Sequence, residues 1–197
     1  MRLAISIYGK RGFSEGREGI GDKLDLEITY NHLKKHILSK YKNTEIFIHN
    51  WEKQENQYFK EVFKTQNVLS ENQKNFGFDL KKMSLAKIND ELNEGAEFRG
   101  VSQMYSFYKA VDMIIKYEEK KKITYDFILC MRADTLICKN LNFKKLRKDE
   151  IYLEKKINNI KKNIVDFKKN FDHKSFIVIL NTKILKSLII AIYFPLA

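Results

Sequence analysis

The sequence predicts a single α/β domain in which helices flank a mostly parallel sheet. Three observations predict it: short apolar runs of strand length, intervening segments with apolar residues at helical spacing, and a sequence without internal repeats or Pro/Gly/Ser-rich linkers. The 197 residues suit one domain, and a hydrophobic content of 44% is enough to build a core. Wholesale disorder is therefore excluded.

The first part of the chain has the pattern strand, loop, helix, strand. Leu3–Tyr8 is a short, largely apolar run that ends at Gly9, as expected of a buried strand. A glycine-rich loop follows, and the helix after it has an apolar stripe at Leu26, Tyr30, Leu33, Ile37 and Tyr41. Glu45–His49 predicts a second buried strand, parallel to the first through a right-handed crossover. Ligands of such sheets bind at the carboxyl ends of the strands.

The middle of the chain predicts three helices and a central strand. Trp51–Lys64 and Lys82–Glu94 are the first two helices, and Ser102 is the expected N-cap of a longer third one. Tyr125–Met131 is almost continuously apolar, which places it centrally in the sheet. Glu150–Leu153 predicts a later strand.

The last segment, residues 176–197, is considered apart from a core domain over residues 1–175. Phe176–Leu180 has strand character, and an apolar helical stripe is possible at Ile184, Leu185, Leu188, Ile189 and Ile192. The segment closes the core, forms an interface, or marks a shortened or altered terminus, and all three alternatives stay open. Its longest uninterrupted apolar run, Ser187–Ala197, is too short for a bilayer span of about 20 residues.

Charge and cysteine content narrow the function classes. Lys and Arg number 37 against 25 acids, a net charge of +12 that invites a polyanion-binding interpretation. Nearly all of this charge is lysine, however, and a nucleic-acid module is expected to interleave arginines and stacking aromatics with its basic stripe. Cys130 and Cys138 form neither a disulfide framework nor a zinc site. The apolar run before Gly9 is too short for a signal peptide, so we expect a cytoplasmic protein.

Several motifs of known function are incomplete in this sequence. Gly16–Lys23 has the outer spacing of a P-loop, but Asp22 stands where the lysine belongs and no Ser or Thr follows. His32 and His36 are spaced i, i+4 without the acid of a zinc protease, and a polar helix face is the favoured interpretation. Cys130, inside an apolar strand, is typical of a small core residue. Hydrolase interpretations therefore have no support.

The informative pair is Arg132 and Asp134, directly after the central strand. A carboxylate there can hold a divalent ion that bridges a diphosphate, while the neighbouring cation neutralises charge on a leaving group. The alternative is a structural ion pair at the end of a strand. These two residues alone do not decide between the alternatives.

Four segments follow one another in an order that resembles a known family. They are Leu3–Gly9 with Arg11 and Phe13, Glu45–Trp51, Ser102–Ala110 and Tyr125–Asp134. Together they resemble the core of the GT-A-like glycosyltransferases associated with capsule, lipooligosaccharide and other surface-glycan loci, over about residues 1 to 155. The resemblance implies a GT-A-like, Rossmann-like α/β fold and a nucleotide-sugar site.

The resemblance also implies roles for individual residues. It places Tyr8, Gly9 and Arg11 near the nucleotide, Ser102, Gln103 and Tyr105 along the donor pocket, and Arg132 and Asp134 in the metal-ligand motif. A divalent cation, Mn or Mg, on Asp134 is therefore an expected cofactor. Two positions depart from the family pattern: Arg11 stands one residue before the arginine of Gly-x-x-Arg, and Arg132 replaces the first acid of Asp-x-Asp.

The expected activity is transfer of a sugar from a nucleotide-diphosphate sugar to a glycan or lipid-linked glycan acceptor. Peripheral contact with the inner face of the cytoplasmic membrane, and an oligomer, are compatible with it. Asp166 and Asp172 are candidates for the base by chain order only, and solvated acids in a Lys-rich segment are the favoured alternative. Two other functions stay open: a non-catalytic basic protein that binds nucleic acid or anionic membrane, and a shortened transferase with little activity.

Overall fold

The computed structural model describes residues 1–14, 21–75, 94–146, 151–153, 160–162 and 177–180. In chain order the elements are β1 (Leu3–Tyr8), α1 (Leu26–Leu33), β2 (Thr44–Asn50), α2 (Asn56–Phe63), β3 (Val68–Ser70), α4 (Glu94–Lys121), β4 (Phe127–Arg132), β5 (Ile151–Leu153), β6 (Ile160–Lys162) and β7 (Ile177–Leu180). They build a seven-stranded sheet in the order β3-β2-β1-β4-β7-β5-β6. The predicted α/β class is confirmed.

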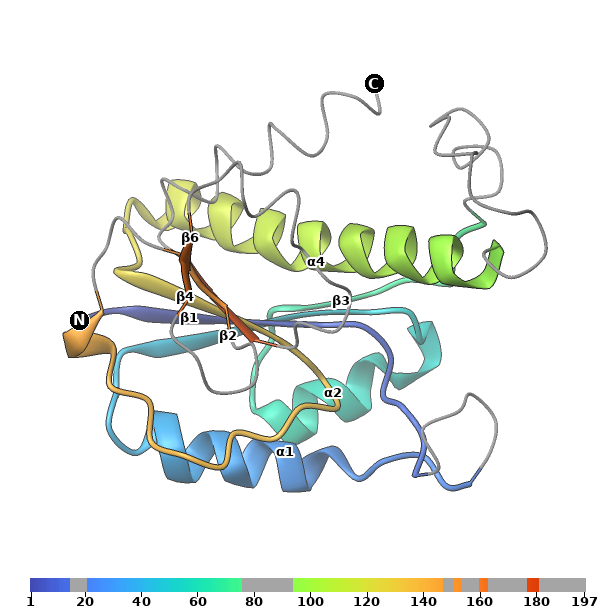
Figure 1. Ribbon diagram of the computed structural model, residues 1–197, viewed down its shortest axis with the longest axis horizontal. Helices are drawn as coiled ribbons and strands as arrows, with labels where there is room; N and C mark the ends of the chain where they lie inside the picture. The colour runs from blue at the N-terminus through green and yellow to red at the C-terminus, as the bar shows by residue number, and fades with distance from the viewer. Residues whose placement is uncertain (15–20, 76–93, 147–150, 154–159, 163–176, 181–197) are drawn as a thin grey trace.

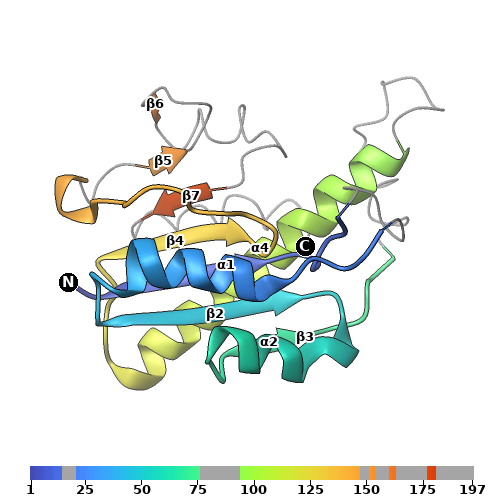
Figure 2. The same cartoon turned by 90° about the horizontal axis from the view of Figure 1, so that it is seen from below.

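One half of the sheet is parallel, and the order in which the chain adds its strands reverses between β1 and β4. β1 pairs in parallel with β2 on one side and β4 on the other, and β2 pairs in parallel with β3. The chain runs outward from β1 to β3, then returns through α4 to β4. α1 and α2 lie across one face of the sheet and α4 crosses the other (Figure 1; Figure 2). This is the Rossmann-like arrangement expected of a doubly wound sheet.

The other half of the sheet is antiparallel. β7 pairs with β4, β5 pairs with β7, and β6 pairs with β5, each in antiparallel register. The strands predicted at the end of the chain are therefore present as β5 and β7, and β4 is the middle strand of the seven, as its apolar sequence predicts.

Side chains of the central strands alternate between the two faces of the sheet. Ile5 and Ile7 of β1 belong to the core cluster shared with α1 and α2, whereas Ala4 and Tyr8 belong to the cluster under α4. The period of two residues along an extended strand produces this division. Both faces of β1 are buried, which accounts for its nearly continuous apolar sequence.

Two helix predictions need correction. Ser102 is not the N-cap of the long helix, because α4 begins at Glu94 and Ser102 lies inside it. The helix predicted from Trp51 begins only at Asn56, after a single 3₁₀ turn over Lys53–Glu55. The three-residue β3 is not predicted at all, since so short a run has no recognisable alternation.

The first helix is longer than α1 alone, because the π-helical turn Lys34–Leu38 continues it. Asp25 caps its start, accepting a hydrogen bond from the Glu27 backbone N–H at 2.9 Å.

Some predicted features lie outside the described residues. These are most of the helix predicted over Lys82–Glu94, of which only Glu94 is described, and the apolar stripe predicted from Ile184. Among the helices that the structure does describe, none has both the length and the apolar character needed to cross a membrane.

Candidate functional site

The carboxyl ends of β1 and β4 meet where the strand order reverses. Tyr8 is paired with Arg132 in the parallel register, and the Ala133 backbone N–H donates to the Tyr8 carbonyl at 3.3 Å. The helix that follows β1, α1, lies on one face of the sheet, and the helix that leads into β4, α4, lies on the other. In open α/β sheets, ligands bind outside the carboxyl ends of the strands where the strand order reverses in this way.

Arg132 and Asp134 form a two-bond ion pair at this point. Arg132 Nε donates to Asp134 Oδ1 at 2.8 Å, and Nη2 donates to Oδ2 at 2.5 Å. The side chains are 35% and 21% exposed, so the pair is partly accessible to solvent at this edge of the sheet. The two side chains predicted to act together are therefore in direct contact.

The carboxylate of Asp134, as arranged, does not fit a metal ligand. Both of its oxygens accept hydrogen bonds from Arg132, and a guanidinium directly beside them opposes a second cation. No group of three His, Cys, Asp or Glu side chains with metal-binding geometry occurs among the described residues. The divalent cation stays a prediction, and binding it at Asp134 requires Arg132 to move.

Tyr8 and Gln103 contribute buried polar atoms beside this pair. The Tyr8 hydroxyl and Gln103 Nε2 are both buried, and neither forms a hydrogen bond of ideal geometry within the described part of the chain. Burial raises the pKa of Tyr8 well above its usual value, while a hydrogen bond from Gln103 and the positive charge of Arg132 oppose the rise. A neutral phenol and an amide that interact with one another thus accompany the ion pair.

The loop after β1 passes close to Asp134. Gly12 has φ +80°, and a Cβ atom there would lie 3.1 Å from Leu24 Cδ1 and 3.5 Å from Asp134 Cβ. Both the positive φ and the close approach require glycine. The adjacent bridge between Phe13 and Lys23 folds the loop back on itself.

Arg11 connects the loop after β1 to the segment after β2. Its backbone N–H donates to Glu52 at 3.1 Å, its Nη1 is 3.5 Å from Glu55 Oε2, and its guanidinium stacks 4.2 Å above the ring of Tyr58. Arg11 therefore anchors the loop, and its role near a nucleotide stays a prediction.

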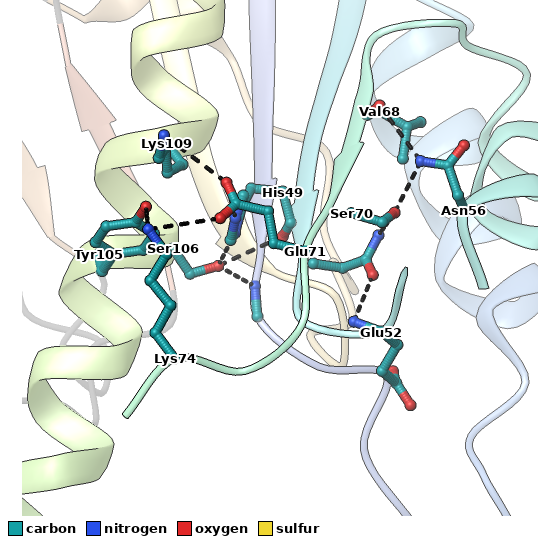
Figure 3. Close-up of polar contacts among 12 residues, drawn as sticks. His49, Glu52, Asn56, Val68, Ser70, Glu71, Lys74, Tyr105, Ser106 and Lys109 are labelled. Carbon is teal, nitrogen blue, oxygen red and sulfur yellow. Dashed lines mark hydrogen bonds and ion pairs between the residues drawn. The ribbon is translucent and has the colours of Figure 1, made fainter. Parts of the chain in front are cut away.

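A second polar cluster lies at the carboxyl ends of β1 and β2, under α4 (Figure 3). The Gly9 backbone N–H donates to Ser106 Oγ at 2.9 Å and also to the His49 carbonyl at 3.1 Å. Ser106 Oγ lies 2.7 Å from Nδ1 of the fully buried His49. Burial lowers the pKa of His49 to about 4, so the imidazole is neutral near pH 7 and shares one hydrogen bond between its Nδ1 and the Ser106 hydroxyl, with the donor set by the tautomer.

Charged and aromatic side chains surround the outer side of His49. Glu71, which follows β3, lies 3.6 Å from His49 Nε2, 3.8 Å from Lys74 Nζ and 3.7 Å from Lys109 Nζ. Figure 3 shows Lys109 and Tyr105 projecting from α4 toward this carboxylate. Because two ammonium groups share one carboxylate, Lys74, Lys109, Glu71 and Tyr105 form a rim of net positive charge at this edge of the sheet.

Of the two remaining predicted residues, Tyr105 belongs to this rim and Ser102 lies beside it. The Tyr105 ring stacks on Trp51 with centroids 5.3 Å apart, and Lys74 Nζ lies 4.4 Å above its centroid. Ser102 Oγ exchanges hydrogen bonds with the Gln73 side-chain amide at 3.0 and 3.2 Å. Asp166 and Asp172, the candidate bases, lie outside the described residues.

Sequence reasoning missed four polar residues of this edge: His49, Glu71, Ser106 and Lys109. A signal existed for His49, which ends a predicted strand, and for Ser106, which follows Ser102 by one helical turn. Glu71 had none, since β3 was not predicted.

Comparisons with known proteins identify a family but no characterised relative. No curated protein and no solved structure is significantly similar to this chain. One family model, described as a domain of unknown function (DUF7796), matches residues 19–159, from the loop after β1 to a point beyond β5. Because this match covers more than half of the 197 residues, the chain belongs to the DUF7796 family.

Proposed function

We propose that this protein is a glycosyltransferase that takes a sugar from a nucleotide-diphosphate sugar and transfers it to a surface-glycan acceptor. The observation that carries the proposal is the Arg132–Asp134 pair at the switch point between β1 and β4, with Tyr8 at the end of β1 and Gly9 directly after it. This edge is where a doubly wound sheet binds ligands. The resemblance of the same segments to GT-A-like enzymes supports the same assignment.

The chemistry needs a cation where the diphosphate leaves. As the glycosidic bond breaks, negative charge develops on the departing phosphate oxygen, and a fixed positive group stabilises it. Arg132 supplies that group, since a guanidinium matches phosphate oxygens in geometry and keeps its charge. Asp134 orients the guanidinium through two hydrogen bonds. A divalent cation would supply the same electrostatic stabilisation, but the present Arg132–Asp134 arrangement does not fit one.

The donor is proposed to lie along the edge of the sheet from Arg132 toward α4. Tyr8 and Gln103 are proposed to line the diphosphate-sugar portion, because both are buried polar groups whose hydrogen bonds are not ideal among the described residues. The rim of Lys74, Lys109 and Tyr105 adds positive charge and an aromatic face. The acceptor is proposed to be a glycan, free or lipid-linked, and the enzyme is proposed to act in the cytoplasm, in peripheral contact with the membrane.

Calorimetry with nucleotide sugars tests the proposal. The full chain is titrated with uridine, guanosine, cytidine and thymidine diphosphate sugars, once in EDTA and once with manganese. We expect one of them to bind in both buffers, and Arg132→Ala to weaken that binding by about 1.5–3 kcal/mol through loss of a charge-assisted hydrogen bond. Lys116→Ala is the charge-matched control, because Lys116 is 73% exposed and pairs only with Asp112 among described acids.

The alternative function makes a different prediction in the same experiment. A non-catalytic basic protein would bind single-stranded RNA or DNA tightly at physiological salt and would bind none of the nucleotide sugars. That result would overturn the proposal. Manganese-dependent binding that Arg132→Ala does not affect would instead remove Arg132 from the site.

A further inference from the structure

A separate cavity lies at the opposite edge of the sheet, where β1 and β2 begin. It has a volume of about 460 Å³ and is formed by the residue before β1, the turn into β2 and the end of α4. Figure 1 shows the amino end of β1 and the last turn of α4 at the same end of the molecule. A six-residue strand spans roughly 20 Å, so this cavity is well separated from the Arg132–Asp134 pair at the other end of β1.

Three cations line the cavity, each from a different part of the chain. Arg2 precedes β1, Lys42 precedes β2, and Lys121 ends α4. In the part of the chain that the structure describes, none of the three forms an ion pair with a carboxylate. Outside the cavity lining, Asp126 Oδ2 accepts a hydrogen bond from the Arg2 backbone N–H at 2.8 Å, so the charges of the three side chains are offset only in part.

The one carboxylate in the cavity lining, Glu45, is already engaged. Its Oε1 accepts a hydrogen bond from the Tyr117 hydroxyl at 2.6 Å, and its Oε2 accepts from the buried Tyr125 hydroxyl. These bonds raise the pKa of Tyr117, so the phenol keeps its proton and goes on donating to Glu45. Three cations and one carboxylate leave a formal excess of two positive charges at the cavity.

The helix dipole explains only part of this charge. Lysines in the last turn of a helix stabilise its negative carboxyl end, which accounts for Lys120 and Lys121 of α4. Arg2 and Lys42 belong to other elements, and no helix terminus accounts for them. Because Arg2 and Lys42 lie with Lys121 around one cavity, a bound anion would offset their combined positive charge.

We propose that this cavity is a binding site for a phosphate-bearing ligand, distinct from the proposed nucleotide-sugar site. A phosphate monoester carries a charge of about −1.5 to −2 near pH 7, which matches the local excess of positive charge. Arg2 offers a planar fork for two phosphate oxygens, and Lys42 and Lys121 offer point charges. The phosphate comes either from a free small molecule or from a lipid headgroup.

An NMR titration of the full chain with inorganic pyrophosphate tests the site. We expect saturable shifts of the Asn43, Thr44 and Ile123 backbone amides, separate from any shifts at Gly9 and Ala133 on the other edge. The double variant Lys42→Gln/Lys121→Gln should weaken binding at the cavity at least tenfold and leave the other edge unchanged. The matched control is Lys120→Gln/Lys122→Gln, which removes the same number of charges, both beside Lys121, without touching the cavity lining.

Two further comparisons identify the source of the phosphate and detect nonspecific electrostatic attraction. Sedimentation with phosphatidylcholine vesicles, with and without phosphatidic acid, is compared for the double variant and its control. Pelleting that depends on phosphatidic acid, Lys42 and Lys121 identifies a lipid headgroup, whereas pyrophosphate binding without pelleting identifies a free phosphate ligand. The proposal is overturned if the cavity amides do not saturate, or if both double variants weaken binding equally. Arg132→Ala leaves the cavity titration intact, so the two proposed sites fail or succeed separately.

Discussion

At the scale of single residues, the turn at the end of β4 explains the candidate site. Arg132 ends β4, and the Thr135 N–H donates to the Arg132 carbonyl at 3.2 Å, so the turn brings the Asp134 carboxylate back against the Arg132 guanidinium. The two residue types and their spacing were visible in the sequence. Their direct pairing was not, because it depends on the turn that follows Ala133.

Replacing Asp134 tests whether the Arg132–Asp134 pair has a functional or a structural role. We expect Asp134→Ala to abolish sugar transfer, because Arg132 loses the partner that orients it. The free energy of unfolding should change by less than about 1 kcal/mol, since partly exposed ion pairs contribute little to stability. Urea denaturation and a transfer assay on the same preparation check both expectations. An unfolded variant would favour the structural ion pair, and a fully active one would remove Asp134 from the site.

His49 predicts a dependence of stability on pH. Its pKa is about 4 in the folded protein against an ordinary value of 6.5, so the unfolded chain binds a proton that the folded protein does not. Its contribution is fully present above pH 6.5 and is lost as the pH falls toward 4, to a total of about 3 kcal/mol. Unfolding free energies of the wild type and His49→Asn between pH 4 and 7 test this. The difference between the two proteins should shrink steadily on acidification, and a constant difference would contradict the assignment.

At the scale of elements, strands were easier to predict than helix boundaries. Buried strands such as β1 and β4 are marked by their own apolar sequences, which local chemistry dictates. The start of α4 depends instead on where the chain comes back to the sheet. Ser102 fits an N-cap by residue type, but in the structure it pairs with Gln73, a partner 29 residues away that no local pattern identifies.

Two serines on α4 offer a matched test of how the helix is fixed to the sheet. Ser106 is fully buried between the Gly9 amide and His49, whereas Ser102 bonds only to the Gln73 side chain among described residues. Ser106→Ala should cost about 1–3 kcal/mol, because a buried imidazole nitrogen loses its partner. Ser102→Ala should cost about 0.5–1.5 kcal/mol at most, the usual contribution of one hydrogen bond. Equal losses in urea denaturation would show that the Ser106 network does not fix α4.

The carboxyl end of α4 is predicted to gain stability from glycine. Lys122 has φ 54°, the Ile123 N–H bonds to the Glu118 carbonyl at 3.1 Å, and the Lys122 N–H bonds to the Glu119 carbonyl at 3.4 Å. This is the Schellman arrangement, in which glycine is the favoured residue. Lys122→Gly should raise the free energy of unfolding by about 1 kcal/mol, since a left-handed backbone strains other residues. Lys120→Gly, inside the helix, should lower it by a similar amount, and a loss in both variants would contradict the assignment.

At the scale of the whole molecule, the parallel half of the sheet was predictable and its extension was not. A strand, a helix and a second strand in sequence imply parallel pairing, and β1 and β2 obey this rule. β7 was predicted as a strand, but its place beside β4 was not. That pairing joins segments about 50 residues apart, whose register no local sequence pattern specifies. For the same reason the polar edge formed by His49, Glu71 and Ser106 emerged only from the assembled sheet.

The position of β7 predicts that the two halves of the sheet unfold together. β7 is the only link between β4 and the β5–β6 pair among the described strands, and Ile179 is paired with Leu129 on one side and Tyr152 on the other. Ile179→Pro removes a backbone donor from an interior strand, where proline is not tolerated, and should cost about 3 kcal/mol or more. Ile179→Val is the control and should cost at most about 1.5 kcal/mol.

Trp51 provides a distant probe of this coupling, because it follows β2 on the other side of β1. If the sheet is one cooperative unit, the fluorescence of Trp51 and the far-ultraviolet circular dichroism of Ile179→Pro shift to lower urea concentration together. A Trp51 transition that stays at the wild-type midpoint, while part of the circular dichroism signal is lost earlier, would show that the parallel half folds independently of β7. The proposed nucleotide-sugar site, which is built entirely on that half among the described residues, would then survive in the variant.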